Sequence, residues 1–238
     1  DRDKYLKKEH DMKLLTLIDK KVNNNIELNL GELKFLYEID DKISGFGFME
    51  DPRIKEIKSK RNIKRDYSII LNIKEEDVAL SQEEWKQNPN KFKILDSDLY
   101  LWHLVKPNGL VLPHHINGSL SLSNLTSAEG LVLPQNIGGD LLLWSLTSAE
   151  GLVLPQSVGG NLELTRLNSA EDLVLPQNIG GDLYLTRLTS AEGLVLPYGF
   201  DLNKLICPSY IKNEILQNPD KYFRKPPSEE ENISIHHK

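Results

Sequence analysis

The chain has 238 residues and a net charge of −6 at pH 7, with 39% hydrophobic and 27% charged residues, a composition ordinary for a globular protein of one or two modest domains. The negative charge argues against general attraction to nucleic acid or anionic lipid, and no apolar stretch approaches the roughly 20 residues that span a bilayer. Cys207 is the only cysteine, which excludes an internal disulfide framework and a cysteine-based metal cluster. We therefore expect a reduced, cytoplasmic setting. Because the sequence begins at Asp1 rather than Met, a removed signal peptide and a secreted effector stay open.

Residues 1–96 carry patterns typical of helices and are expected to form a helical N-terminal domain that also acts as a cap. The segment NLGELKFLYEIDDKI has apolar residues at helical spacing: Leu33, Leu36 and Ile39. In DPRIKEIKSKRN, Asp51 is expected to cap a helix that has Pro52 at its first position. In SQEEWKQNP, Ser81 and Glu84 have the spacing of a capping box, and the following proline ends the helix.

Residues 52–65, PRIKEIKSKRNIKR, hold seven basic residues against one acid. A basic helix can bind phosphates, so this segment gives a second functional hypothesis, a nucleic-acid-associated factor. The residues that would contact nucleic acid are Lys55, Lys58, Lys60, Arg61, Lys64 and Arg65. The alternative interpretation is a solvated helix face, with Ile54 and Ile57 turned to the core.

The remaining part of the chain is dominated by an internal repeat. The tetrapeptide LVLP recurs every 21 residues, at Leu110, Leu131, Leu152, Leu173 and Leu194. Variants of IGGDL and LTSAE accompany it, and a partial first copy, SDLYLWHLVKPNG, begins at Ser97. The copies are too short to bury their own leucines, so we expect them to stack as the coils of a solenoid.

Each segment of one copy has a local interpretation. Leu141 and Leu143 alternate with outward residues, which predicts a half-buried strand. The preceding Gly-Gly is expected to let the backbone turn through conformations closed to other residues. Thr147 and Glu150 have capping-box spacing and Gly151 follows, which predicts one tight helical turn. LVLP is then expected to be an extended return segment, since proline disfavours a central strand.

We therefore predict an α+β fold with a parallel β-solenoid, leucine-rich-repeat-like, whose five 21-residue coils cover residues 97–202. Strand neighbours lie ~4.8 Å apart, so the coils would form a body roughly 24 Å long. The segment SYIKNEILQNPDKYF is expected to be a helix within a C-terminal cap, residues 203–224. The polar tail, residues 225–238, is expected to be disordered.

The stretch VGGNLELTRLNSAEDLVLP resembles the short leucine-rich-type repeats of bacterial and phage proteins that carry GGDLxLxxLTSLP. The resemblance covers under half of the chain. It implies a bacterial or phage origin and a curved solenoid whose LxLxx strands line the concave side. The usual leucine-rich repeat has asparagine after LxLxx, whereas this chain has leucine there: Leu125, Leu146, Leu167 and Leu188. The usual asparagine ladder is therefore not expected.

The copies differ mainly at three outward positions of the strand. The first holds Tyr100, Ser121, Leu142, Glu163 and Tyr184; the second holds Trp102, Ser123, Trp144, Thr165 and Thr186; the third holds His103, Asn124, Ser145, Arg166 and Arg187. Stacked, they make an aromatic surface with a basic edge, and exposed Trp, Tyr and Arg dominate binding energy at protein interfaces. The predicted partner-binding residues are Tyr100, Trp102, His103, Leu142, Trp144, Glu163, Arg166, Tyr184 and Arg187. The alternatives are plain sequence drift and covering of the surface by the N-terminal helices.

Other chemistries are weakly supported. The repeated glutamates Glu129, Glu150, Glu171 and Glu192 lack the pattern of calcium-binding repeats and are expected to be structural. His103, His114 and His115 do not predict a zinc site, since adjacent residues on an extended segment point apart. Cys207 is expected to be a core residue rather than a nucleophile. No phosphate-binding loop, GxSxG or HExxH motif is present.

We therefore predict a non-enzymatic protein, without metal or cofactor, that recognises another protein through the strand surface of its solenoid. The partner's identity, and whether it is inhibited, scaffolded or targeted, stay open. A monomer without membrane association is expected. The nucleic-acid-associated factor is the alternative, and an enzyme within residues 1–96 is a third, less supported class.

Overall fold

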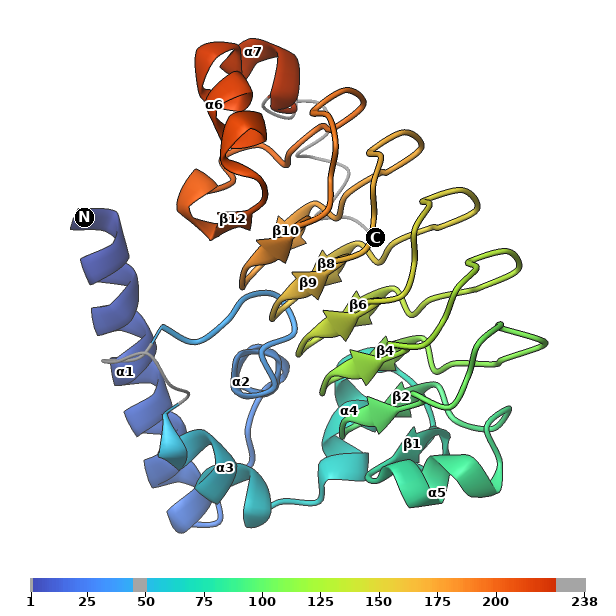
Figure 1. The fold of residues 1–238 in the computed structure, drawn as a ribbon. Coiled ribbons are helices and arrows are strands. Elements are labelled where there is room, and N and C mark those ends of the chain that lie inside the picture. The colour runs from blue at the N-terminus through green and yellow to red at the C-terminus, as the bar shows by residue number, and fades with distance from the viewer. Residues whose placement is uncertain (1, 45–50, 226–238) are drawn as a thin grey trace. The chain divides into compact units, whose positions relative to one another are not determined.

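The computed structural model describes residues 2–44 and 51–225 (Figure 1). The chain divides into two compact units, residues 1–78 and 79–238. Residues 79–96, which we expected to belong to the helical N-terminal domain, thus group with the repeats. Apart from Lys225, the tail expected to be disordered lies outside the described residues.

The first unit is helical, as the sequence predicts. Its elements are α1 (Arg2–Asn23), α2 (Leu30–Leu36), α3 (Pro52–Ser59), α4 (Ile63–Leu71) and a short 3-10 helix, η1 (Glu75–Asp77). Asp51 caps α3 by accepting the backbone N–H of Arg53, and Pro52 opens the helix, as expected. α2 is shorter than its apolar spacing suggests, because it ends at Leu36 and leaves Ile39 outside.

Helix α1 was not predicted from the sequence. Only three of its 22 residues are buried, namely Asp11, Leu15 and Ile18, so its apolar pattern is weak. Although α1 is long, none of the helices formed by the described residues is both long and apolar enough to cross a membrane.

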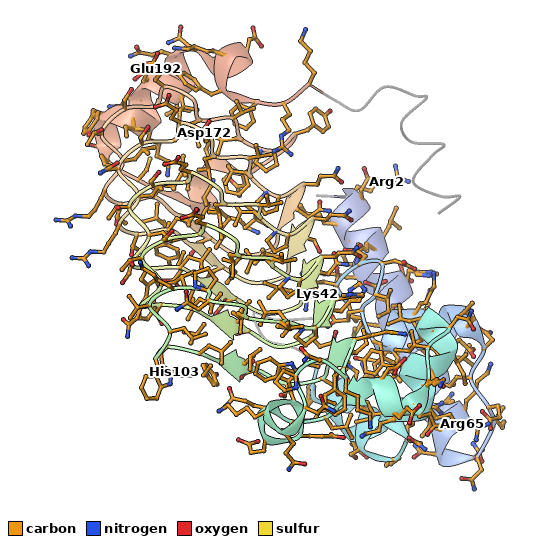
Figure 2. All side chains as sticks on the ribbon, turned by 90° about the vertical axis from the view of Figure 1, so that its right-hand side faces the viewer. Arg2, Lys42, Arg65, His103, Asp172 and Glu192 are labelled. Carbon is orange, nitrogen blue, oxygen red and sulfur yellow. The ribbon has the colours of Figure 1, made fainter. Side chains whose placement is uncertain are left out.

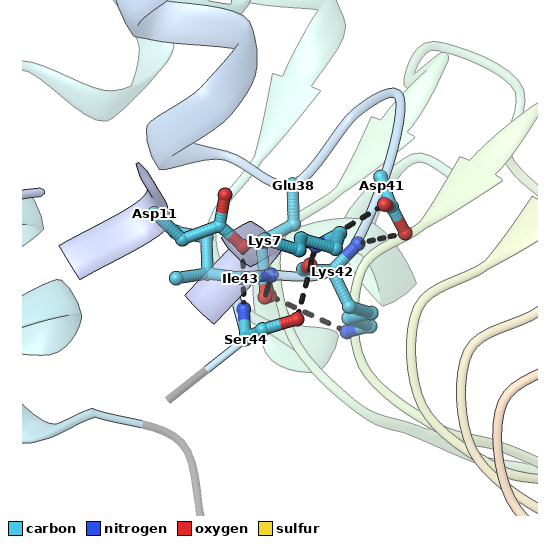
Figure 3. Close-up of polar contacts among 7 residues, drawn as sticks. All are labelled: Lys7, Asp11, Glu38, Asp41, Lys42, Ile43 and Ser44. Atoms are coloured by element: carbon cyan, nitrogen blue, oxygen red, sulfur yellow. Dashed lines mark hydrogen bonds and ion pairs between the residues drawn. The ribbon is translucent and has the colours of Figure 1, made fainter. Parts of the chain in front are cut away.

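A polar cluster ties α1 to residues 41–44 (Figure 3). The carboxylate of Asp11, which is buried, accepts hydrogen bonds from Lys7 Nζ and from the backbone N–H of Ser44, both at 2.8 Å. Lys7 Nζ also donates to the Lys42 carbonyl at 2.7 Å and lies 3.2 Å from an Asp41 oxygen. Burial alone would lower the pKa of Lys7, but its hydrogen bonds to Asp11 and Asp41 raise the pKa above the usual lysine value. These charged hydrogen bonds therefore help to hold α1, which buries little apolar surface, against residues 41–44.

The second unit is a parallel β-solenoid of about five coils, as predicted (Figure 1). One sheet has the strand order β1 (Val78–Ala79), β2 (Ile94–Leu95), β4 (His115–Ile116), β6 (Asn136–Ile137), β8 (Ser157–Val158) and β10 (Asn178–Ile179). The other has the order β12 (Leu205–Ile206), β11 (Leu183–Tyr184), β9 (Leu162–Glu163), β7 (Leu141–Leu142), β5 (Leu120–Ser121) and β3 (Leu99–Tyr100). Each repeat thus contributes two short strands instead of the expected one, because the segment before Gly-Gly also pairs between coils.

The leucines of successive coils form continuous buried columns. In the second sheet, Leu99, Leu120, Leu141, Leu162 and Leu183 pair in register, each 21 residues from the next. The leucines at the position that leucine-rich repeats give to asparagine are also buried: Leu125, Leu146, Leu167 and Leu188. A fully buried leucine contributes about 1.5–3 kcal/mol relative to an exposed one, so the columns are the main source of cohesion between coils.

The Gly-Gly pairs are required by close packing between coils rather than by unusual backbone angles. The glycines with positive φ in this unit are all at other positions. A Cβ added at Gly138 would overlap the carbonyl oxygen of Asn117, and one at Gly180 would overlap that of Gly159. The expected conformational reason is therefore wrong, and the correct reason is that the neighbouring coil passes too close for any side chain.

A polar ladder joins the coils at the position just before each strand of the second sheet. The side chain of Asp98 accepts the backbone N–H of Ser119 at 2.7 Å, and Ser119 Oγ accepts that of Asp140 at 3.0 Å. Asp140 in turn accepts from Asn161 at 2.6 Å, and Asn161 from Asp182 at 2.8 Å. The residue type changes from copy to copy, but each side chain supplies an acceptor. This ladder serves the backbone of a solenoid that has leucine in place of the usual asparagine.

The segment LTSAEG forms a β-turn and not the predicted helical turn. In the coil with Thr147, the turn is closed by the Leu152 N–H, which donates to the Ala149 carbonyl at 2.9 Å. The side-chain acceptor is Ser148 Oγ, 3.1 Å from the Glu150 nitrogen. The predicted capping box between Thr147 and Glu150 is thus wrong, because the chain needs a reversal here and serine two residues before the glutamate provides it.

Short elements cover both ends of the solenoid. At the first end, α5 (Gln82–Gln87) is capped by Ser81, as predicted, and Gln82 Oε1 accepts the N–H of Tyr100 on the edge strand β3. At the other end lie η2 (Leu202–Lys204), β12, α6 (Ser209–Gln217) and α7 (Pro219–Tyr222). The single helix predicted here is divided at Asn218 because Pro219 starts a new one. Cys207 is half-buried, and burial raises the pKa of its thiol.

The turn after each alanine gives a stability prediction. Gly130, Gly151 and Gly193 have φ of +74°, +71° and +79° at this position, and the fourth copy places Asp172 there at φ +61°. Replacing Asp172 with glycine should raise the free energy of unfolding by about 0.5–1 kcal/mol, since relief of the left-handed conformation exceeds the added flexibility of the unfolded chain. Urea unfolding measures this change.

The matched variant is Gly130→Ala, where an added Cβ meets nothing within 4 Å. It should lower the free energy of unfolding by about 1 kcal/mol through backbone strain alone. If Asp172→Gly destabilises the protein as much as Gly130→Ala does, the turn assignment is incorrect.

Candidate binding surface

The outward residues of the second sheet and of the turns that follow its strands form a surface that we call the strand face. Its first column runs in register through Tyr100, Ser121, Leu142, Glu163, Tyr184 and Ile206. The members of the first predicted column are therefore neighbours in register. The second and third columns were expected on the strand, but they lie in the turns that follow it, because each strand is only two residues long. Ile206 is an addition to the prediction: it lies on β12, beyond the last recognisable repeat, where LICPSY no longer matches the repeat pattern.

The predicted residues differ in how far they reach solvent. Trp102 is 62% exposed, Tyr100 45% and Trp144 43%. His103, Arg166 and Arg187 are also exposed, whereas Leu142, Glu163 and Tyr184 are partly buried. All nine residues thus belong to the second unit, and six of them are largely open to solvent.

Two members of the columns are not available at the surface. Ser121 and Ser123 are 3% and 9% exposed, and their hydroxyl oxygens lie 2.7 Å apart in a hydrogen bond. Buried polar groups need such partners, so the two serines satisfy each other. They separate the first coil's aromatic residues, Tyr100 and Trp102, from Trp144 two coils away.

Hydrogen bonds fix the orientation of the aromatic rings. Trp144 Nε1 donates to a Glu163 carboxylate oxygen at 2.6 Å, across one coil. The Tyr100 hydroxyl donates to Asp98 at 2.9 Å, and this bond is the main reason that the pKa of Tyr100 is raised. The pKa of Tyr184 is raised by burial and by nearby carboxylates, Asp182 first among them. Both phenols therefore stay protonated near neutral pH. The hydrogen bonds of Trp144 and Tyr100 orient their rings, so these rings lose less rotational freedom when a partner packs on them.

Arg166 and Arg187 form the basic edge of the strand face. They occupy the same position in neighbouring coils, ~4.8 Å apart along the solenoid, and both are exposed. Neither takes part in an ion pair within the described ranges 2–44 and 51–225. Two guanidinium groups side by side, without such pairs, are suited to carboxylates of a partner.

A shallow pocket of about 620 Å³ lies beside the strand face, along the loop of the first coil. It is lined by His103, Leu104, Val105, Lys106, Pro107, Asn108, Gly109 and Leu110. Its walls hold one histidine and one lysine but no carboxylate, cysteine or hydroxyl, so they do not provide an acid, a base and a nucleophile together.

The histidines are placed as surface and structural groups. His114 is exposed, whereas His115 is partly buried and its Nδ1 lies 3.2 Å from the side-chain amide nitrogen of Asn136 in the next coil. Burial, assisted by the neighbouring His114, lowers the pKa of His115. Within the described part of the chain, no group of three or more metal-ligating side chains comes together.

The basic segment 52–65 is not the single helix that the sequence suggested. Lys60 ends α3 and Asn62 caps α4, so the basic residues divide between two helices. Arg61 donates two hydrogen bonds to the buried Asp66 carboxylate, at 2.6 and 2.7 Å.

Most other basic residues of the segment are engaged within the first unit. Lys58 lies 5.0 Å from the centre of the Tyr37 ring, and Lys60 pairs with Glu56 at 2.8 Å. Arg65 lies 3.7 Å from Glu27 at an exposed position, Lys64 also has an interaction within the chain, and Lys55 is exposed. The segment therefore presents a weaker phosphate-binding surface than its composition indicates.

Comparison with known proteins does not add a functional assignment. No family model, curated protein or solved structure matches this chain. The resemblance to short bacterial and phage repeats thus rests on the repeat sequences alone.

Because most basic residues of segment 52–65 are engaged within the chain, we predict that binding to RNA or DNA is weak and depends only slightly on salt concentration. If only Lys55 and Arg65 contact phosphates, a plot of log K against log salt should have a slope of about −2 or less in magnitude. Fluorescence anisotropy with a labelled 20-nucleotide RNA and a DNA duplex measures it. A slope of about −5, as six phosphate contacts would give, would instead support the nucleic-acid hypothesis.

Proposed function

We propose that the protein is a non-enzymatic binding protein and that its strand face recognises another protein. The observation that carries the proposal is the pair Trp102 and Trp144, both exposed and both at the same position of the turn that follows a strand of the second sheet. Exposed tryptophan costs solvation free energy unless a partner covers it, and tryptophan is among the residues most enriched at binding hot spots.

The composition of the strand face fits a protein partner. Aromatic residues supply apolar contact area, and Arg166 and Arg187 supply charged hydrogen-bond donors at the edge. This arrangement of an apolar centre and a polar rim is typical of protein interfaces. Because Trp144 already donates a hydrogen bond to Glu163, its indole ring loses less conformational entropy when a partner binds.

Removal of one anchor and one cation tests the proposal. In the double variant Trp144→Ala and Arg187→Gln, capture of partners from a lysate of the native host should fall at least tenfold, since each hot-spot residue typically supplies more than about 1.4 kcal/mol. Circular dichroism and the unfolding midpoint should stay close to those of the original chain, because both side chains are exposed.

The matched control is the double variant Tyr198→Ala and Lys86→Gln, which removes an exposed aromatic ring and an exposed cation outside the strand face. It should leave capture unchanged. Equal capture by the strand-face variant and the original chain would show that the face is not the recognition surface.

A further inference from the structure

A second exposed apolar surface lies outside the two sheets, on the segments that follow the turns of the solenoid. It consists of the valine of each LVLP segment: Val111, Val132, Val153, Val174 and Val195. Val132 and Val153 are both 74% exposed, and the neighbouring Leu133 and Leu154 are only partly buried. We call these five valines the valine column.

The valine column does not vary as the strand face does. Each of the three outward positions of the strand holds three or four different residue types, whereas this outward position is valine in all five copies. The valine side chains add little to the core, because they are 40–74% exposed. An exposed position that stays apolar in every copy points to a shared contact.

Acidic residues lie three positions before the valine in four of the five copies. These residues, Glu129, Glu150, Glu171 and Glu192, are all exposed, and Asp172 adds a further carboxylate. Figure 2 looks onto this edge and labels Asp172 and Glu192 there. None of these five carboxylates forms an ion pair with another part of the chain that the structure describes.

We propose that the valine column and its adjacent glutamates bind a basic amphipathic helix of a partner protein. Apolar residues of the helix would pack on the valines, and lysine or arginine beside them would face the glutamates. Like charges one coil apart repel one another by about 1 kcal/mol in water. A basic partner removes that repulsion and gains electrostatic complementarity.

The spacing favours a helix over an extended strand as the occupant. Backbone hydrogen bonds from Gln156 to Gln135 and from Gln177 to Gln156 join the coils three residues after the valines. Successive valines therefore lie about one strand spacing, ~4.8 Å, apart, and one helical turn rises ~5.4 Å. An extended peptide places residues of one face about 6.7 Å apart, so it loses register after two coils. A helix along the solenoid axis keeps one apolar residue near each valine over most of the column and is wide enough, at about 10 Å, to reach the glutamates as well.

Selection from a phage-displayed library of 18-residue helical peptides, with the full chain as the target, tests the proposal. The recovered peptides should have apolar residues once per turn with lysine or arginine beside them. Their affinity should fall at least tenfold for the triple variant Val132→Thr, Val153→Thr and Val174→Thr, which keeps the side-chain shape but removes apolar surface. Their affinity should also fall with added salt and for the double variant Glu150→Gln and Glu171→Gln.

The control is the strand-face variant Trp144→Ala and Arg187→Gln, which should bind the same peptides normally, so this proposal stands apart from the proposed function. Failure to recover peptides, recovery of acidic peptides, or equal binding to the threonine variant would overturn it. Concentration-dependent dimerisation that the threonine variant abolishes would also overturn it, since the occupant would then be a second copy of this chain.

Discussion

The burial of leucine between coils is the constraint on which the rest of the solenoid depends. A repeat of 21 residues has too few side chains to enclose its own apolar groups, so each coil is stable only against its neighbours. The register of one coil on the next follows from this requirement. Leu141 pairs with Leu120 and Leu162. A shift in register by one residue would move the leucines of the shifted strand from the core side to the solvent side. The Gly-Gly pairs belong to the same constraint, because they let the backbones of neighbouring coils approach closely. The polar ladder from Asp98 to Asp182 belongs to it as well, because its side chains accept hydrogen bonds from backbone N–H groups of the next coil.

The sequence is informative about the fold wherever a pattern repeats. The 21-residue period and the alternation at Leu141 and Leu143 are sufficient to predict parallel strands stacked in coils. The predictions that are wrong concern residue types that can have either of two structural roles. Gly138 is typical of a flexible turn, but it is needed for lack of space beside Asn117. Glu150 has the spacing of a capping box, but the serine before it makes the turn. A single sequence does not distinguish these interpretations, because both use the same residues.

The surface is predictable in part for the same reason. Outward positions on a strand follow from its alternation, so the column of Tyr100 and its equivalents can be identified from the sequence. The column of Trp102 lies in the turn after the strand, and only the 21-residue period identifies it. Burial of Ser121 and Ser123 is not predictable, because the repeat pattern places both positions outward and does not show that they are covered. The valine column is difficult to recognise in the sequence, because LVLP is as constant between copies as a segment that only maintains the fold. A signal is nevertheless present, because the central residue of LVL must point away from two inward leucines. If both surfaces bind, the chain is an adaptor that joins two proteins along one solenoid, and variation between copies would set the specificity of one surface only.

The stacking itself is tested most directly by a distance within the second unit. Spin labels placed on cysteines at positions 102 and 186, in a background with Cys207→Ser, would mark equivalent exposed positions four coils apart. Pulsed electron paramagnetic resonance should give a narrow distribution near ~19 Å, from four steps of ~4.8 Å, broadened only by the label linkers. A broad distribution that reaches well beyond the length of the stacked coils would contradict the shared leucine core.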